Sequence, residues 1–312
     1  MPNSIFNRSH FHDEAEAFAK LESIVWPNGP VCPHCGGIGR TYPLNGVKDK
    51  KGRVRLGLKK CGQCRGQFTV RKNTVFESSH VPLHIWFQAT FLMCSSKKGV
   101  SSNQLHRTLG VTLKTAWFMS HRLREAMRVL KLDPIGGAGK FVEADETYIG
   151  GKARNRAYRE PPPKEAVMAL VEREGTVRSF HLRTATVTAE TIRPIIAEVL
   201  STDSHLRTDE SGIYWKIGEK FASHRTVNHS ANEYVRGDAH INTIDGYFSI
   251  LKRGIYGVYQ HVSEEHLKRY LAEFDFRYNE RQALGVGDVE RTEAALRGIV
   301  GKRLTYRVSL PA

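Results

Sequence analysis

Two pairs of cysteines are the residues whose spacing most clearly predicts chemistry in this chain. They are Cys32-Pro-His-Cys35 and Cys61-Gly-Gln-Cys64, with 25 residues between the pairs. Each pair places two thiolates on one tight turn, and two such turns complete the tetrahedral shell that Zn²⁺ prefers. A redox pair, the competing interpretation, normally occurs singly at the start of a helix. The spacing therefore predicts a structural zinc site, with His34 as a bystander.

Acidic residues in the second half of the chain are candidates for binding a different metal. In the segment Phe141–Ile149, the two-residue period of a strand places Glu143 and Asp145 on one face and Glu146 on the other. Asp209 ends another strand-like segment, at the carboxyl edge where α/β sheets usually carry their sites. An acidic pair within a strand is costly unless a cation compensates its charge.

A third acid lies on a segment with helical periodicity, residues 239–253. Its apolar stripe is Ile241, Ile244, Phe248 and Leu251, and beside it runs a polar stripe of Asn242, Asp245, Ser249 and Lys252. Carboxylates from two strands and this helix could hold two Mg²⁺ ions and clamp the oxygens of a phosphodiester displacement. Surface positions for these acids are the alternative.

Short strands are expected to hold the zinc site, and helices are expected to follow it along the chain. The basic segment from Lys48 to Lys60 predicts a hairpin between the cysteine pairs. A hairpin with two cysteine turns is typical of a zinc ribbon. Its basic face could lie along a phosphate backbone or face solvent. Beyond Pro82, a capped helix that stops at Gly110 and a longer basic helix from Thr112 predict a helix-turn-helix. In that interpretation Lys114, His121, Arg122 and Arg124 are exposed and approach DNA, whereas Leu113, Trp117, Met119 and Leu123 include the core.

The remaining elements predict an α/β or α+β domain with a mixed sheet. A stretch with three glycines and a proline, residues 132–140, is typical of a linker before this domain. The expected strands are 140–149, 166–172, 176–184 and 205–209, with a further one at 225–228, and the expected helices are 189–200, 239–253 and 263–281.

The charge distribution supports the same division. Residues 1–140 carry 22 basic and 8 acidic residues, a net charge of +14, whereas residues 141–312 carry 25 and 24, a net charge of +1. An imbalance confined to one half indicates a polyanion partner for that half. The chain has only five cysteines, no apolar run of membrane-spanning length and no apolar leader, so it is expected to be cytoplasmic and without a membrane partner.

Taken together, these segments resemble the zinc-ribbon DDE transposases of bacterial insertion sequences. The resemblance runs in order from about residue 20 to 282. It is carried by the cysteine pairs and by the segments 74–82, 95–99, 114–117, 143–151, 206–209, 240–246, 252–254 and 270–279.

The resemblance implies a zinc ribbon, a helix-turn-helix and a ribonuclease H-like α/β domain that cuts and joins DNA with Mg²⁺ or Mn²⁺. It implies Asp145, Asp209 and Asp245 as the metal-binding triad, Lys252 as a phosphate contact, and Asn242 as a contact to metal, DNA or the helix cap. Its partners would be the terminal inverted repeats of the element and target DNA, bound by a homo-oligomer associated with the bacterial nucleoid. The family commonly has Glu at the third acidic position, so Asn242 or Glu143 could complete the site instead.

The expected organisation is therefore multidomain. Residues 1–80 hold the zinc ribbon, 81–132 the all-α helix-turn-helix, 140–285 the catalytic domain and 286–312 a tail. Two other functions fit these features: a zinc-containing DNA-binding regulator without nuclease activity, and a ribonuclease H-like nuclease without strand transfer. Magnesium-dependent nicking separates the first from a transposase, and a joined DNA product separates the second.

Overall fold

The computed structural model describes residues 4–131, 133–150, 164–184 and 186–305. Leu132 in the expected linker, Gly151 at the end of the segment 143–151 and the last residues of the tail lie outside this range. The chain divides into two compact units. Unit 1 is Met1–Ser96, Val100–Arg128 and Gly287–Ala312, and unit 2 is Lys97–Gly99 and Val129–Val286. No helix in the described ranges is long and apolar enough to span a membrane.

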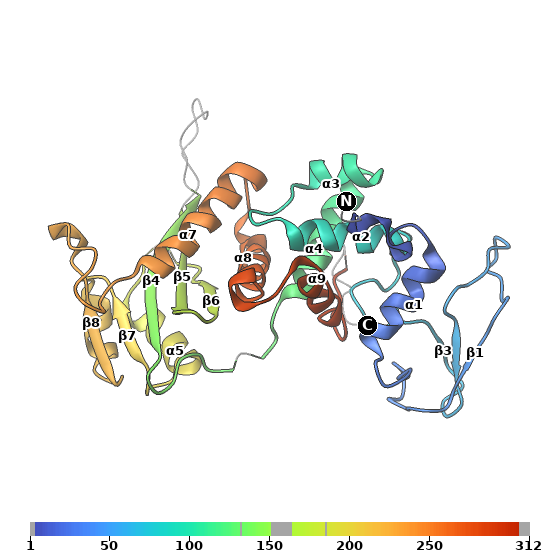
Figure 1. Cartoon of the computed structure of the whole chain (residues 1–312), viewed down its shortest axis with the longest axis horizontal. Coiled ribbons are helices and arrows are strands. Elements are labelled where there is room, and N and C mark those ends of the chain that lie inside the picture. The colour runs from blue at the N-terminus through green and yellow to red at the C-terminus, as the bar shows by residue number, and fades with distance from the viewer. Residues whose placement is uncertain (1–3, 132, 151–163, 185, 306–312) are drawn as a thin grey trace. The chain divides into compact units, whose positions relative to one another are not determined.

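Unit 1 combines a small antiparallel sheet with a group of helices. The strands, in the order β1-β2-β3, are β1 (Thr41–Pro43), β2 (Lys59–Cys61) and β3 (Gln67–Phe68). The helices are α1 (Glu14–Val25), α2 (Leu83–Ser95), α3 (Ser102–Leu109), α4 (Leu113–Met127) and α9 (Asp288–Arg297). Helix α9 packs against α1, α2 and α4, so the end of the described chain belongs to the same core as its beginning (Figure 1).

The ends of the unit 1 helices follow from their sequences. The Asp13 side chain accepts a hydrogen bond from the Glu16 N–H and begins α1, and Ser101 and Thr112 cap α3 and α4 in the same way. Helix α3 ends at Gly110, whose φ of 67° lies in the left-handed region that favours glycine. The predicted helix, glycine turn and second helix are therefore present. Cys94 of α2 is fully buried.

Unit 2 is built on a mixed five-stranded sheet, among the residues described, in the order β6-β5-β4-β7-β8. The strands are β4 (Phe141–Gly150), β5 (Lys164–Glu172), β6 (Val177–His181), β7 (His205–Thr208) and β8 (Ser223–Thr226). Strands β4, β5 and β6 pair antiparallel, whereas β4, β7 and β8 pair parallel. The predicted mixed sheet is confirmed.

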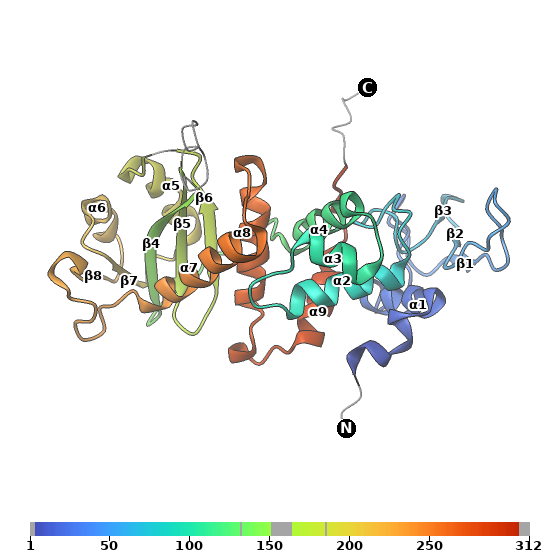
Figure 2. The ribbon, with the colours of Figure 1, turned by 90° about the horizontal axis from the view of Figure 1, so that it is seen from above.

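Helices cover both faces of this sheet. They are α5 (Ala189–Val199), α6 (Trp215–Gly218), α7 (Asn242–Gly254) and α8 (Glu264–Asn279). Helices α7 and α8 bury an apolar cluster against one face, and α5 with the segment that includes Tyr214 buries a second cluster against the other face (Figure 2). The predicted apolar stripe of α7 is buried in the first cluster. Both faces of the central strand β4 are therefore covered by packed side chains.

Candidate functional site

The four paired cysteines come together in unit 1. The Sγ atoms of Cys32 and Cys64 lie 3.7 Å apart, as do those of Cys35 and Cys61, and all four lie within 4.8 Å of one another. Zinc–sulfur bonds of about 2.3 Å in a tetrahedron give sulfur–sulfur distances of about 3.8 Å, so this donor set fits Zn²⁺. His34 is not part of the cluster, and its ring lies near the Gln67 carbonyl instead.

Two similar turns hold the cysteines in place. The Gly36 N–H donates to the Cys32 carbonyl at 2.9 Å, and the Arg65 N–H donates to the Cys61 carbonyl at 3.1 Å. Gly36 and Arg65 both have positive φ, which lets each chain segment reverse behind its cysteine pair. Hydrogen bonds from the backbone N–H groups of Cys64 and Gln63 lower the pKa of the Cys61 thiol to about 6. Lowering this pKa favours the thiolate, which is the metal-binding form.

The predicted exposure of three basic residues on α4 is wrong. His121, Arg122 and Arg124 are buried, with relative exposures of 0%, 7% and 1%. Arg122 donates to the carbonyls of Glu77 and Leu304, and these contacts hold the segment after α9 on α4. The sequence pattern did not reveal this packing, because the residues around 300 that cover the helix are far from it in sequence.

The beginning of α4 has the opposite character. Lys114 is exposed as predicted, but Leu113, which was expected in the core, has a relative exposure of 45%. Trp117 is half-buried, whereas Met119 and Leu123 are buried as expected. The surface available on this helix is therefore its first turn.

The parallel pairing of β4 and β7 brings two of the predicted acids to one place in unit 2. Glu143 lies opposite Arg207 in the register. Continuing that register by two residues places Asp209, just after β7, beside Asp145 of β4. Both side chains are half-buried. The parallel sheet thus supplies the first two acids from adjacent chain segments.

Helix α7 brings the third acid to the same face of β4. The N–H groups of Thr243 and Ile244 donate to Glu143 Oε2 at 2.8 and 3.0 Å, which attaches the start of α7 to the strand. Asp245 follows Ile244 directly and Asp145 follows Glu143 by two residues along the strand. Asp245 and Asn242 are exposed in the first turns of the helix, and Lys252 is half-buried farther along it.

The electrostatics of Asp145 reflect this convergence. Burial, together with the charges of Glu146, Asp209 and Asp245, raises the pKa of Asp145 to about 8. Partial burial also raises the pKa of Asp245, while the charges of His229 and Lys252 oppose that rise. A group of carboxylates that repel one another, as those around Asp145 do, is chemically suited to a hard divalent cation such as Mg²⁺ or Mn²⁺.

Glu146 is an acid of this neighbourhood that the sequence reasoning did not single out. Its side chain accepts a hydrogen bond from the Tyr214 hydroxyl on the face opposite α7. Burial raises the pKa of Glu146 to about 7, and the Asp209 charge adds to the rise. Direct adjacency to Asp145 was the only signal in the sequence, and strand alternation argued against it. The structure shows that Asp209, beyond the strand end, is close enough to affect acids from both faces.

Glu143 is not available to complete the acidic site. It is fully buried, and both of its oxygens accept hydrogen bonds from α7 or from Arg173. The possibility raised by the sequence, that Glu143 substitutes for a metal ligand, is therefore not supported by its contacts.

Two groups of side chains in the described ranges have three or more metal-binding atoms within 4.8 Å of one another. One is the cysteine cluster, and the other is Glu165, His181 and Glu264. In the second, His181 Nε2 lies 2.8 Å from Glu165 Oε2, so a hydrogen-bonded pair accounts for most of that cluster. The three aspartates do not meet this limit for one shared ion. Two ions about 3.5–4 Å apart are held by carboxylates spread over a wider site.

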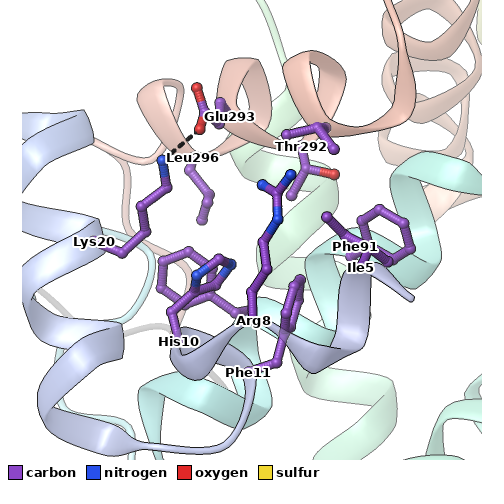
Figure 3. Close-up of a pocket in the computed structure, with 11 residues that line it drawn as sticks. Ile5, Arg8, His10, Phe11, Lys20, Phe91, Thr292, Glu293 and Leu296 are labelled. Carbon is purple, nitrogen blue, oxygen red and sulfur yellow. Dashed lines mark hydrogen bonds and ion pairs between the residues drawn. The ribbon is translucent and has the colours of Figure 1, made fainter. Parts of the chain in front are cut away.

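A pocket in unit 1 is too small to be a ligand site. It lies between the N-terminal segment and α9, and the ion pair between Lys20 and Glu293 crosses its edge at 2.6 Å (Figure 3). The volume is about 20 Å³, which is enough for a single water molecule.

Metal affinity at the acidic site is expected to depend on pH. Because the pKa of Asp145 is raised to about 8, a bound proton must leave when a cation binds. We expect Mg²⁺ affinity to rise by up to about tenfold per unit between pH 6 and 8 and to level off above pH 8. Calorimetry in buffers of different ionisation enthalpy measures the released proton. Pure ionic-strength effects would give no such buffer dependence.

The same shift has a defined effect on stability without metal. The folded chain binds the Asp145 proton more tightly than the unfolded chain does, because the ordinary pKa of this carboxyl is near 3.8. The free energy of unfolding should therefore fall as pH rises from about 4 to about 8, and saturating Mg²⁺ should oppose this fall.

Family models match both parts of the chain. Residues 12–67 match the transposase zinc-ribbon domain, and residues 136–279 match the ISXO2-like transposase domain. The first range includes all four cysteines, and the second includes all three predicted aspartates.

Comparison with whole proteins agrees with these matches. A curated relative is the "Uncharacterized protein in transposable element ISH50" of Halobacterium salinarum, which is 27% identical over 289 residues and covers 86% of this chain and 91% of the relative. A solved chain in a simian T-cell lymphotropic virus intasome complexed with a PP2A B56 gamma subunit is 15% identical. That match covers 55% of this chain and 63% of the viral-complex chain with a TM-score of 0.27, too low to support an argument. The two domain matches, in the order predicted by the resemblance, show that this chain belongs to the zinc-ribbon DDE transposase family of insertion sequences.

Proposed function

We propose that this chain binds the ends of its element as double-stranded DNA and catalyses metal-dependent strand cleavage and strand transfer. The observation that carries the proposal is the electrostatic effect of Asp209 and Asp245 on Asp145, which comes from a central strand of the sheet. The raised pKa of Asp145, caused by burial and by the neighbouring acids, supports a role for a divalent cation at this position. Other features of the chain then have defined roles in the reaction.

The aspartates supply oxygen ligands from elements of different kinds. The backbone of Asp145 is held by pairing with Ala169 of β5, and Asp209 directly follows the last residue of β7. Asp245 comes from α7. When bound there, Mg²⁺ or Mn²⁺ supplies activation of the attacking oxygen and stabilisation of the leaving oxygen in phosphodiester displacement. The same site would serve first for water at the element end and then for the freed 3′-hydroxyl at target DNA.

Lys252 and Asn242 are the helix residues proposed to meet the nucleic acid. Lys252 lies seven residues after Asp245, so two helical turns place it on the same side of α7. Its charge already affects the pKa of Asp245. We assign Lys252 to hold a DNA phosphate as a point charge and Asn242, exposed one turn before Asp245, to contact DNA or metal.

The folds of the two units support this assignment. The strand order β6-β5-β4-β7-β8, antiparallel on one side of β4 and parallel on the other, is the arrangement we expect for a ribonuclease H-like domain. Helices α3 and α4, joined by the Gly110 turn, have the lengths and caps we expect for a helix-turn-helix. In that motif the beginning of the second helix approaches base edges, which agrees with an exposed first turn of α4.

The zinc ribbon is proposed as a second DNA contact. The hairpin between its cysteine pairs has exposed basic side chains at Lys48, Lys50, Lys51, Arg53 and Arg55. Asp49 pairs with Arg53 at 2.9 Å, leaving an excess of positive charge along the hairpin. Such a surface binds the DNA backbone without reading sequence. Because an element has two ends, we infer that at least two copies assemble on DNA.

Lys114→Ala is expected to weaken duplex binding by about 3- to 10-fold and to reduce the salt slope by about one. The reason is that Lys114 lies on the exposed first turn of α4. Arg122→Gln should instead destabilise unit 1, since it breaks contacts to two backbone carbonyls. Fluorescence anisotropy across a salt series and thermal unfolding separate the two effects. Lys216→Ala, an exposed lysine of unit 2, is the matched control; an equal loss in it would contradict the assignment.

Strand cleavage and joining on the DNA ends that flank its own gene test the proposal directly. With Mg²⁺ or Mn²⁺, we expect nicked ends and then products joined to target DNA. Cleavage without joined product would identify a nuclease, and salt-dependent binding without nicking would identify a DNA-binding regulator. Either result would overturn the proposed transposase activity of this chain.

A further inference from the structure

The start of α7 has no cap of its own. Its N-cap residue is Ile241, which has no side-chain hydrogen-bonding group, and no side chain of the helix itself caps the first turn. Free N–H groups at a helix start are costly when covered by protein, so another part of the chain must satisfy them. This matters because the same turn carries Asp245.

Glu143, on strand β4 of the sheet against which α7 packs, supplies the missing cap. Its Oε2 accepts the N–H groups of Thr243 and Ile244 at 2.8 and 3.0 Å, and its Oε1 accepts the Thr243 hydroxyl at 2.9 Å. The carboxylate is fully buried, and its negative charge faces the positive end of the helix dipole. Charge-assisted bonds of this kind are stronger and more directional than bonds between neutral groups.

Arg173 fixes the chain just before the helix. Its Nε donates to Glu143 Oε1 at 2.6 Å, while its two terminal nitrogens donate to the carbonyls of Asp238 and His240 at 3.0 and 2.8 Å. The His240 ring lies 3.3 Å from the same Glu143 oxygen. The acid and the arginine thus hold both the first turn of α7 and the segment that leads into it.

These contacts connect two of the proposed metal-binding acids through a short path. Asp145 follows Glu143 by two residues on the same face of β4, and Asp245 directly follows Ile244. A change in the Glu143–α7 contact therefore changes the separation of Asp145 and Asp245.

We propose that Glu143 is a positioning residue for the catalytic site: it sets the distance between Asp145 and Asp245 by capping α7, and it does not bind metal itself. This proposal rests on the proposed function, because it presumes that the two aspartates bind the same group of ions. It also accounts for a buried acid that the catalytic chemistry does not otherwise use.

The test measures Mn²⁺ binding by electron paramagnetic resonance in the full-length, zinc-loaded chain. We expect Glu143→Gln to weaken Mn²⁺ affinity by at least tenfold and to increase hydrogen exchange of the Thr243 and Ile244 amides by at least tenfold. Glu143→Asp should behave similarly, because it keeps the charge but loses reach by one methylene. If the negative charge alone mattered, Glu143→Asp would bind Mn²⁺ like the unaltered chain, and the positioning role would be wrong.

Glu172→Gln is the matched control. Glu172 lies on the neighbouring strand β5, accepts the Gly136 N–H at 3.2 Å and pairs with Lys140, so it also combines a backbone hydrogen bond with an ion pair. Glu172→Gln should leave the Mn²⁺ affinity within about twofold of that of the unaltered chain. Thr243→Val, which removes only the hydroxyl contact, provides a milder variant if Glu143→Gln does not fold. It should weaken binding by about 2- to 5-fold, and unchanged affinity together with unchanged amide exchange would overturn the proposal.

Asp145→Asn distinguishes a failure of the proposed function from a failure of the positioning role of Glu143. If it leaves Mn²⁺ binding unchanged, the proposed function fails. If it weakens binding while both Glu143 variants retain full affinity and protected α7 amides, the metal site stands and the positioning role fails.

Discussion

Asp145→Asn is expected to lower the rate of strand cleavage by at least about 10³-fold, which corresponds to about 4 kcal/mol of activation free energy. The carboxamide keeps the shape of the side chain but removes the negative charge that would hold a divalent cation. The measurement is single-turnover cleavage of radiolabelled element ends at saturating Mg²⁺. Asp209→Asn should have an effect of similar size, since the charge of Asp209 acts on Asp145.

The free energy of unfolding of metal-free Asp145→Asn should rise, although its cleavage rate falls. Removing a carboxylate whose pKa is raised to about 8 relieves both desolvation and repulsion from neighbouring acids. We expect the metal-free variant to be more stable than the unaltered chain at pH 7, by on the order of 1–2 kcal/mol. Asp203→Asn, at an exposed position of the same unit, is the control and should change neither property. Retained cleavage in Asp145→Asn would exclude the triad assignment.

Removal of zinc is expected to unfold the ribbon and to weaken DNA binding by about 10- to 100-fold. The ribbon has a very small apolar cluster, consisting of Cys32, Cys61 and Phe68 with Trp26 packed against it. A core of this size cannot offset the conformational entropy of the hairpin, so the metal must supply the missing free energy. Cys35→Ser should reproduce the effect of chelation, because Cys35 is one of the four clustered thiols.

The measurements are zinc content by mass spectrometry, thermal unfolding and duplex affinity at one fixed salt concentration. Cys94→Ala is the matched cysteine control, since Cys94 is buried in α2 and is not part of the cluster. It should retain one zinc ion per chain. Normal DNA affinity in a zinc-free Cys35→Ser chain would show that the ribbon does not contribute to binding.

Local patterns in the sequence were sufficient for much of the architecture. Cysteine spacing predicted the zinc cluster because its ligands occur in two short turns. Strand and helix periods predicted the mixed sheet and the apolar stripe of α7, since these patterns depend on which residues face a core. The caps at Ser101 and Thr112 and the glycine at 110 similarly predicted where α3 ends and α4 begins. Each of these signals lies within one element.

Long-range packing decided the rest. The basic residues of α4 fit a DNA-facing pattern in sequence, but packing around 300 buries Arg122 beneath the Leu304 carbonyl. Glu143 and Asp145 have the same residue class and the same strand face, yet only the start of α7 distinguishes a helix cap from a proposed metal ligand. The sequence by itself determined which elements form and which side chains could do chemistry. Only the tertiary structure decided what each charged group meets, because burial and hydrogen-bond partners come from segments about 100 or more residues away.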